Sequence, residues 1–367
     1  MRIVGIESMI VEVPLKEPVT GVHGVTSVQK SVLVRVTSDD GLEGWGDVDP
    51  TPGYSLESVD DIAAGVDHLA RAVAGLDPMN TLRALTAMDE TSGRAFEAKA
   101  AIEMALFDLK GKALGVPVHS LLGGRLVDEV FLNAWIGAVP PAQAAREAEG
   151  WVARGFITAK IKVSGAGPEG IERVAAVRAA VGSRMALRVD FNESLAPDEA
   201  VPFIQKLVPY DLTLVEQPVP RDRIDALAEI REQIDIPLMA DESVTSPASL
   251  IEIIKRDAAD IVKVKAMKQG GLLRTRSMID LAEAAGLHVV IGHGFGLTLS
   301  TLAEATLAAT SDAVLPGCEA VGPLKMSADV VANPVDLTHG TLKLPNTPGL
   351  GATIDEKALA RYRRPRR

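Results

Sequence analysis

Short aliphatic segments alternate with helical segments between residues 130 and 319, and this alternation constrains the fold of the 367-residue chain more than any other feature. The segments lie at Val130–Trp135, Ala159–Val163, Ala186–Phe191, Leu212–Val215, Pro237–Ala240, Ile261–Val264 and His288–Ile291, with a weaker one before Glu319. Strands separated by helical stretches of about 10–15 residues are typical of β/α units and a parallel sheet. Eight such units in about 190 residues predict a closed parallel barrel.

The N-terminal part of the chain has a different pattern. Stretches rich in β-forming residues at Ile3–Val13 and Ser31–Val36, with a turn at Asp39-Asp40-Gly41, predict an antiparallel meander. The segment Leu15–Lys30 between them contains proline and glycine and is predicted to be a loop. Helical patterns then fill residues 56–114, so this part is expected to be an α+β unit.

Two domains of an α/β protein follow from these patterns. We expect an α+β capping domain over residues 1–125, completed by residues 325–367, and a barrel domain over residues 126–324. The aromatic content of 4% suits a barrel whose strands carry aliphatic side chains on both faces.

Composition also excludes several classes of protein. The net charge of −11 argues against a nucleic-acid partner, and the single cysteine excludes a disulfide framework or a Cys-rich zinc site. The charge-free run at 284–303 is broken by Gly292-His293-Gly294, which favours a buried strand and helix over a membrane span. We expect a cytoplasmic protein with no membrane partner.

Charged residues end five consecutive strands at nearly constant intervals. The steps from Lys162 to Asp190, Glu216, Asp241 and Lys265 are 28, 26, 25 and 24 residues. Each step is one β/α unit, so the five side chains should meet on the C-terminal rim of the barrel, where active sites of this architecture lie. Three carboxylates at one point would repel one another without a cation, and all-oxygen ligands with open positions favour Mg²⁺ or Mn²⁺.

Lysines flank these carboxylates on opposite sides. A metal that binds a substrate carboxylate would stabilise the enediolate that forms when the α-proton is removed. Lys162 and Lys265 would then act as base and acid, and Lys160 and the cation would lower the pKa of the base by adding positive charge. The sequence therefore predicts an enzyme that acts on a small-molecule carboxylate.

Two alternatives compete with this hypothesis. Gly165–Gly170 has the form G-x-G-x-x-G, with Asp190 at the end of the next strand, and would fit a doubly wound dinucleotide-binding sheet. That interpretation leaves the later strand-end residues unexplained. The other alternative is a non-catalytic barrel protein, against which the intact lysines and carboxylates argue.

With these motifs, the chain resembles the enolase superfamily in the muconate lactonizing enzyme (muconate cycloisomerase) subgroup of the mandelate racemase/muconate lactonizing enzyme family. The resemblance covers nearly the whole chain and includes Ala101–Lys112, Gly115–Val118, Leu121–Gly124 and the pair Gly270-Gly271. It implies that Lys162 and Lys265 form the acid/base pair and that Lys160 assists them. It also implies that Asp190, Glu216 and Asp241 bind Mg²⁺. Three further site residues are implied: Asn192, Glu242 and Glu319. It also implies a modified TIM barrel of the (β/α)7β type and a homo-oligomer.

Two positions distinguish the mandelate racemase branch of the family from the muconate branch. The mandelate racemase branch has Asp at the position of Lys265, paired with a His after the seventh strand, so Lys265 indicates the muconate branch. His293 nevertheless lies in that seventh loop, and it either contacts the substrate or fills a polar position at the rim. Dipeptide epimerases carry Asp-x-Asp on the eighth strand, which Cys318-Glu319-Ala320 lacks, so a dipeptide substrate is not expected.

The segment Leu15–Lys30 matches the mobile segment with which the capping domain closes over substrate. Its tip at residues 20–26 has small residues and no aromatic ring, which predicts a small polar carboxylate. His23 in this tip is either a specificity residue or a solvated one. The expected reaction is cycloisomerisation, with racemisation, epimerisation or dehydration of an amino-acid derivative such as a proline-type acid as the alternative.

Overall fold

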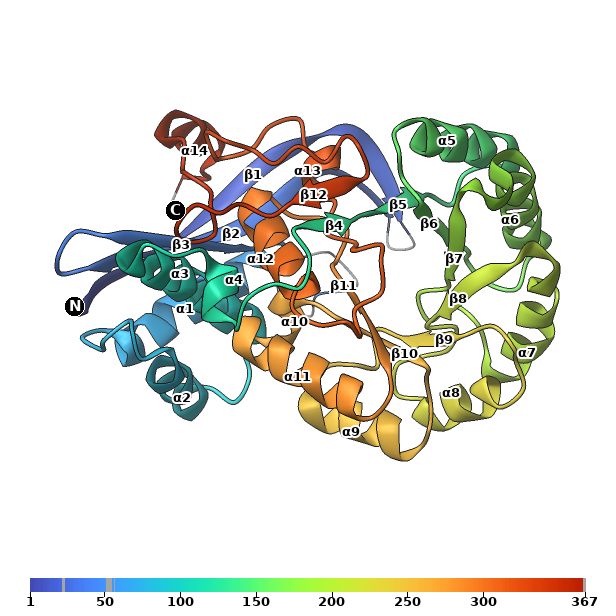
Figure 1. The fold of residues 1–367 in the computed structure, drawn as a ribbon, viewed down its shortest axis with the longest axis horizontal. Helices are drawn as coiled ribbons and strands as arrows, with labels where there is room; N and C mark the ends of the chain where they lie inside the picture. The colour runs from blue at the N-terminus through green and yellow to red at the C-terminus, as the bar shows by residue number, and fades with distance from the viewer. Residues whose placement is uncertain (22–23, 51–54, 56, 366–367) are drawn as a thin grey trace.

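The computed structural model describes residues 1–21, 24–50, 55 and 57–365. An antiparallel sheet with helices on one face lies beside a ring of parallel strands surrounded by helices (Figure 1). The sheet has the order β1 (Ile3–Gly21), β2 (Gly24–Ser38), β3 (Glu43–Val48). The helices that follow are α1 (Val59–Val73), α2 (Thr81–Thr91), α3 (Phe96–Leu114) and the one-turn α4 (Val118–Leu121).

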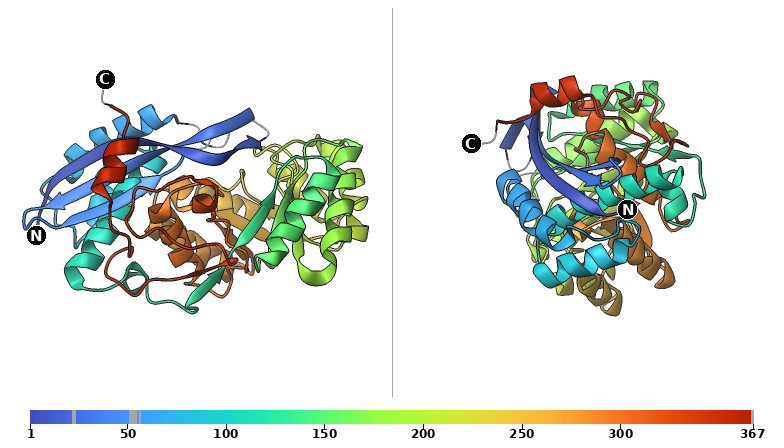
Figure 2. Two further views of the ribbon diagram at one scale, coloured as in Figure 1. Left: turned by 90° about the horizontal axis from the view of Figure 1, so that it is seen from above. Right: turned by 90° about the vertical axis from the view of Figure 1, so that its left-hand side faces the viewer.

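The prediction of a loop over Leu15–Lys30 is wrong for the described residues. β1 and β2 pair as one long hairpin up to Gly21 and Gly24, with a register shift between Pro14 and Val19. Pro18 lies within this shift, where a missing N–H breaks no ladder bond, and alternating Val and Thr residues continue the strands beyond it. The hairpin extends from the N-terminal sheet toward the barrel (Figure 2).

Two glycines allow α3 to pack directly on β3. A Cβ atom on Gly44 would lie 2.0 Å from the carbonyl oxygen of Ala105, and one on Gly46 would lie 2.4 Å from that of Ala101. Asp108 of α3 accepts a hydrogen bond from the backbone N–H of Trp45 at 2.9 Å. The Gly-Trp-Gly sequence of β3 is therefore required by a helix that is buried on nearly every side.

The second sheet contains seven parallel strands in chain order. These are β5 (Asn133–Ile136), β6 (Thr158–Lys162), β7 (Ala186–Asp190), β8 (Leu212–Glu216), β9 (Leu238–Ala240), β10 (Ile261–Val264) and β11 (His288–Ile291). The helices between and after them are α5 (Pro141–Ala153), α6 (Pro168–Val181), α7 (Pro197–Gln205), α8 (Ile224–Arg231), α9 (Pro247–Lys255), α10 (Ala266–Gln269), α11 (Leu272–Ala284) and α12 (Thr298–Ala308). Most of them cover the outside of the ring (Figure 1).

An irregular segment at residues 313–319 closes the ring. Leu315 and Glu319 donate backbone hydrogen bonds to β11, at 2.9 and 2.7 Å. Asn133 of β5 donates to Cys318 at 2.8 Å on the other side. The predicted fold, a modified TIM barrel of the (β/α)7β type beside an α+β unit, is therefore confirmed, with an eighth position that forms isolated bridges in place of a regular strand.

The first predicted barrel strand, Val130–Trp135, is divided in two. β4 (Glu129–Phe131) pairs antiparallel with β12 (Thr341–Lys343), and only β5 joins the barrel. After α13 (Gly322–Lys325), the chain contacts β1 at Pro14, pairs with β4 through β12 and reaches α14 (Glu356–Tyr362), after which Arg363 bridges Val11 of β1. The domain boundaries themselves remain predictions.

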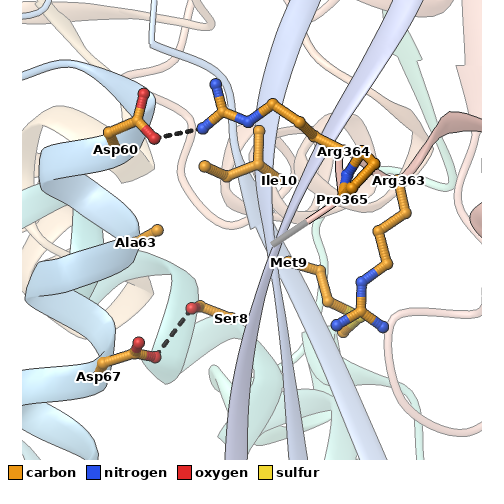
Figure 3. Close-up of a pocket in the computed structure, with 9 residues that line it drawn as sticks. All are labelled: Ser8, Met9, Ile10, Asp60, Ala63, Asp67, Arg363, Arg364 and Pro365. Atoms are coloured by element: carbon orange, nitrogen blue, oxygen red, sulfur yellow. Dashed lines mark hydrogen bonds and ion pairs between the residues drawn. The ribbon is translucent and has the colours of Figure 1, made fainter. Parts of the chain in front are cut away.

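A cavity of about 540 Å³ lies where β1, α1 and the C-terminal residues meet (Figure 3). Four of its polar side chains are paired with one another, Arg364 with Asp60 and Ser8 with Asp67 at 2.8 Å, and Arg363 pairs with Glu7 at 2.7 Å. None of the charged strand-end residues of the barrel lines it. In the part of the chain that the structure describes, no helix is long and apolar enough to cross a membrane.

Candidate active site

The structure brings the five strand-end residues together on the C-terminal rim of the barrel. Lys162, Asp190 and Glu216 end β6, β7 and β8 and lie opposite one another in the strand register. Asp241 and Lys265 directly follow β9 and β10. The ammonium group of Lys162 lies 2.6 Å from Asp190, and that of Lys265 lies 2.8 Å from Asp241. The two lysines therefore stand at opposite ends of a row of three carboxylates.

Below this row lies a buried ring of charges. Lys160 contacts Asp190 and Glu216, each at 3.1 Å, and Glu319 at 2.6 Å. Lys263 contacts Glu216 at 3.0 Å and also pairs with Glu319. Lys263 was not among the residues predicted from the sequence, although it precedes Lys265 by two residues, as Lys160 precedes Lys162. Side chains two apart on a strand share a face, so this alternation was a usable signal.

The charges of the ring perturb its carboxylates in opposite directions. Burial alone would raise the pKa of Glu319, but the ammonium groups of Lys160 and Lys263 lower it to about 2. Burial and the neighbouring Asp190 raise the pKa of Glu216 to about 8 despite the same two lysines. Of the two glutamates in the ring, Glu216 is therefore the one whose ionised form is less stabilised.

The two outer lysines have different surroundings. The Lys162 side chain is 30% exposed and also donates to Asn192 at 2.6 Å. The Lys265 side chain is 4% exposed, and burial lowers its pKa to about 7, with Lys263 and Lys268 acting in the same direction and Asp241 opposing them. Burial thus favours the neutral form of Lys265, the form that a general base requires.

A sharp turn after β7 positions Asn192. The residue has a φ of 44°, a left-handed conformation that Asn tolerates better than most residues, and its backbone N–H donates to Asp190 at 2.9 Å. Its side chain donates to Glu242 at 3.0 Å. Asn192 thereby links Lys162 to Glu242 across the carboxylate row.

The donor set suits a hard cation. Asp190, Glu216 and Asp241 are buried carboxylates from three adjacent strands, and Oε2 of Glu242 beside them is buried with no hydrogen-bond partner among the described residues. Oxygen ligands of this kind are those that Mg²⁺ prefers. Within the described ranges no group of three acidic, histidine or cysteine side chains is arranged to hold a metal ion as it stands. In this structure, lysine ammonium groups contact the three carboxylates instead.

His293 lies in a buried ion network between the barrel and the N-terminal sheet. Its Nδ1 lies 3.0 Å from Glu304 of α12, and its Nε2 lies 3.7 Å from Asp49, which follows β3. Burial opposes protonation, but these two carboxylates raise the pKa of His293 to about 10. Ser300 donates to Asp47 at 3.2 Å and to Asp49 at 2.8 Å.

Both ring nitrogens of His293 face carboxylates, as expected for a residue that fills a polar position at the rim, and its contact with substrate stays a prediction. Asp47 and Asp49 were not among the residues predicted from the sequence. The available signal was their alternation with Gly46 and Val48. His23, the other predicted specificity residue, lies outside the described residues.

The fold and the rim together define a class of protein, a (β/α)-barrel enzyme whose site is built from lysines and carboxylates at the strand ends. Residues 5–123 match the mandelate racemase / muconate lactonizing enzyme N-terminal domain, and residues 143–358 match a family described as enolase C-terminal domain-like. The chain belongs to the mandelate racemase/muconate lactonizing enzyme family of the enolase superfamily, as the resemblance predicted.

Characterised relatives and solved structures span two reaction types. An N-succinyl-L-Arg/Lys racemase of Bacillus cereus is 33% identical over 98% of this chain and 97% of its own length. A muconate lactonizing enzyme of Pseudomonas fluorescens, solved with muconolactone, has a TM-score of 0.94 and 31% identity, covering 99% of both chains. A dipeptide epimerase of Enterococcus faecalis, solved with Mg and L-Leu-L-Tyr, has a TM-score of 0.92 and 31% identity over 96% of this chain and 100% of its own.

Proposed function

We propose that this protein removes the α-proton of a small carboxylate and returns a proton to the product, with Lys162 and Lys265 as the two proton-transfer groups. The observation that carries the proposal is the position of these lysines at opposite ends of one carboxylate row. A substrate held over that row would present one face to each lysine. Such an arrangement serves cycloisomerisation, racemisation and β-elimination alike.

The remaining residues hold the reacting groups in place. Asp190, Glu216 and Asp241 would hold Mg²⁺, which supplies positive charge beside the substrate carboxylate and so lowers the energy of the enediolate. Asn192 orients the Lys162 ammonium group at 2.6 Å. Lys160 supports the carboxylate row from below through its contacts with Asp190 and Glu216, each at 3.1 Å.

The leading reaction is a cycloisomerisation of the muconate lactonizing type, supported by the likeness to muconate lactonizing enzymes over the whole chain. Racemisation, epimerisation or dehydration of an amino-acid derivative, such as a proline-type acid, is the second candidate. The similarity to an N-succinyl-L-Arg/Lys racemase favours it. Cys318-Glu319-Ala320 lacks the paired aspartates expected for a dipeptide substrate.

Three finer expectations belong to the same proposal. Mn²⁺ would replace Mg²⁺ at the all-oxygen donor set. The chain would assemble as a homo-oligomer, and it would work in the cytoplasm.

Exchange of the α-proton in heavy water tests the proposal. The protein is incubated with a library of cyclic amino acids, acylated amino acids and muconate-like diacids, with Mg²⁺ and with a chelator. We expect deuterium at the α-carbon of at least one acid, only when the metal is present. Absence of exchange across the library would favour the non-catalytic barrel protein.

A further inference from the structure

A further lysine at the rim has no carboxylate within ion-pair distance among the described residues. Lys325, the last residue of α13, is 8% exposed, and its ammonium group lies 4.3 Å from the ring centroids of both Trp135 and Phe295. It donates one hydrogen bond, to the carbonyl oxygen of Gly294. No carboxylate of residues 1–21, 24–50, 55 or 57–365 lies within ion-pair distance of it.

The position of Lys325 places this ammonium group beside the proposed site. Trp135 belongs to β5 and lies opposite Lys160 in the strand register. Gly294 and Phe295 belong to the loop after β11, and the backbone N–H of Gly294 donates to Glu319 at 2.8 Å. Lys325 therefore lies over the seam where the first and last barrel strands meet.

The charges around Lys325 are mainly positive. Burial lowers its pKa to about 7, and the positive charges of Lys162 and Lys160 act in the same direction, with Glu319 opposing them. A buried cation is costly unless it is paired, and two aromatic faces with one carbonyl group compensate only part of that cost. At the other end of the row, Lys265 already has Asp241 as its partner.

We infer that Lys325 binds a second carboxylate of the substrate, distal to the one bound at the carboxylate row, so that the site selects dicarboxylates over monocarboxylates. The inference rests on the proposed proton-transfer function and names its substrate class. A substrate anion at this position would supply the charge partner that Lys325 lacks and would offset the repulsion from Lys162.

Binding of inert diacids tests this role separately from catalysis. The probes are succinate, glutarate and adipate, each compared by calorimetry with its own monoamide, which has nearly the same shape and one negative charge fewer. With Mg²⁺ present, we expect the protein to bind at least one diacid at least tenfold more tightly than its monoamide. Lys325→Met should remove most of that preference without weakening the monoamide.

Lys343→Met is the matched control. Lys343 is an exposed lysine of β12, a strand that pairs with β4 and with none of the barrel strands. The control should keep the wild-type preference, and thermal melting should show that both variants are folded. Met is expected to fit between Trp135 and Phe295 because its flexible thioether packs well against aromatic rings.

Two outcomes would overturn the inference. One is equal binding of diacid and monoamide by the wild-type protein, and the other is a preference that survives in Lys325→Met. Neither outcome would contradict the proposed proton-transfer function, because the α-proton exchange assay tests that function separately. Among acids that do exchange, the inference also predicts that Lys325→Met raises KM for diacids at least tenfold, with KM for monoacids unchanged.

Discussion

The buried histidine of the rim predicts a pH-dependent contribution to stability. His293 is 4% exposed and is paired with Glu304 and Asp49, and Glu97 of α3 also lies within its electrostatic reach. The perturbation is His293→Gln, which keeps a polar side chain of similar size and removes the positive charge. Because His293 joins the barrel to the N-terminal sheet, the variant should weaken the attachment between them.

The size of the effect follows from the pKa. The pKa of His293 is raised from 6.5 to about 10, and a pKa difference of one corresponds to about 1.4 kcal/mol. The free-energy change that corresponds to this pKa shift agrees with the usual cost of removing one partner of a buried ion pair, about 3–5 kcal/mol. A raised pKa stabilises the folded state fully below pH 6.5, and this contribution is lost as the pH rises toward about 10.

Urea unfolding at pH 6, 8 and 10 measures this directly. We expect the wild-type protein to exceed His293→Gln by about 3–5 kcal/mol at pH 6, by less at pH 8, and by little at pH 10. His68→Gln, on the exposed face of α1, is the control and should match the wild-type protein at each pH. A difference that does not change with pH, or none at pH 6, would refute the reasoning.

Two further predictions concern the metal ligands and the packing of α3. Asp241→Asn should weaken Mg²⁺ binding at least tenfold in calorimetry, because a charged ligand becomes neutral; unchanged affinity would remove Asp241 from the ligand set. Gly46→Ala should lower the free energy of unfolding by about 1–3 kcal/mol or more, since its Cβ would lie 2.4 Å from a backbone oxygen of α3. Gly150→Ala in α5, with open space around it, should instead raise stability by up to about 1 kcal/mol, and equal effects of the two substitutions would contradict the packing argument.

The sequence predicted the parts of the fold that depend on periodicity. Aliphatic segments and helices alternate regularly enough to define the barrel, and strand ends carry the site because parallel strands share one rim. The eighth position could not be predicted in detail, because residues 313–319 close the barrel through a few backbone bonds. The full length of the β1–β2 hairpin was not predicted, because proline and glycine locally favour a loop. Pairing between the two strands nevertheless extends through this segment.

The same limit applies to the site. Residues at strand ends were found by their spacing, whereas Lys263 was missed because it lies inside the aliphatic segment Ile261–Val264. Lys325 was missed for a different reason. It follows the barrel in the sequence and reaches the rim only because α13 folds back beside Trp135 and Phe295, a contact that no local pattern encodes.

The central claim is that Lys162 and Lys265 transfer the proton from opposite sides of the carboxylate row. The measurement is the rate of α-proton exchange in heavy water by Lys162→Ala and by Lys265→Ala, with an acid that the wild-type protein exchanges. We expect each variant to lose about 10²–10⁴-fold in turnover while it stays folded. A near-wild-type rate in both directions of proton transfer, in either variant, would contradict the account.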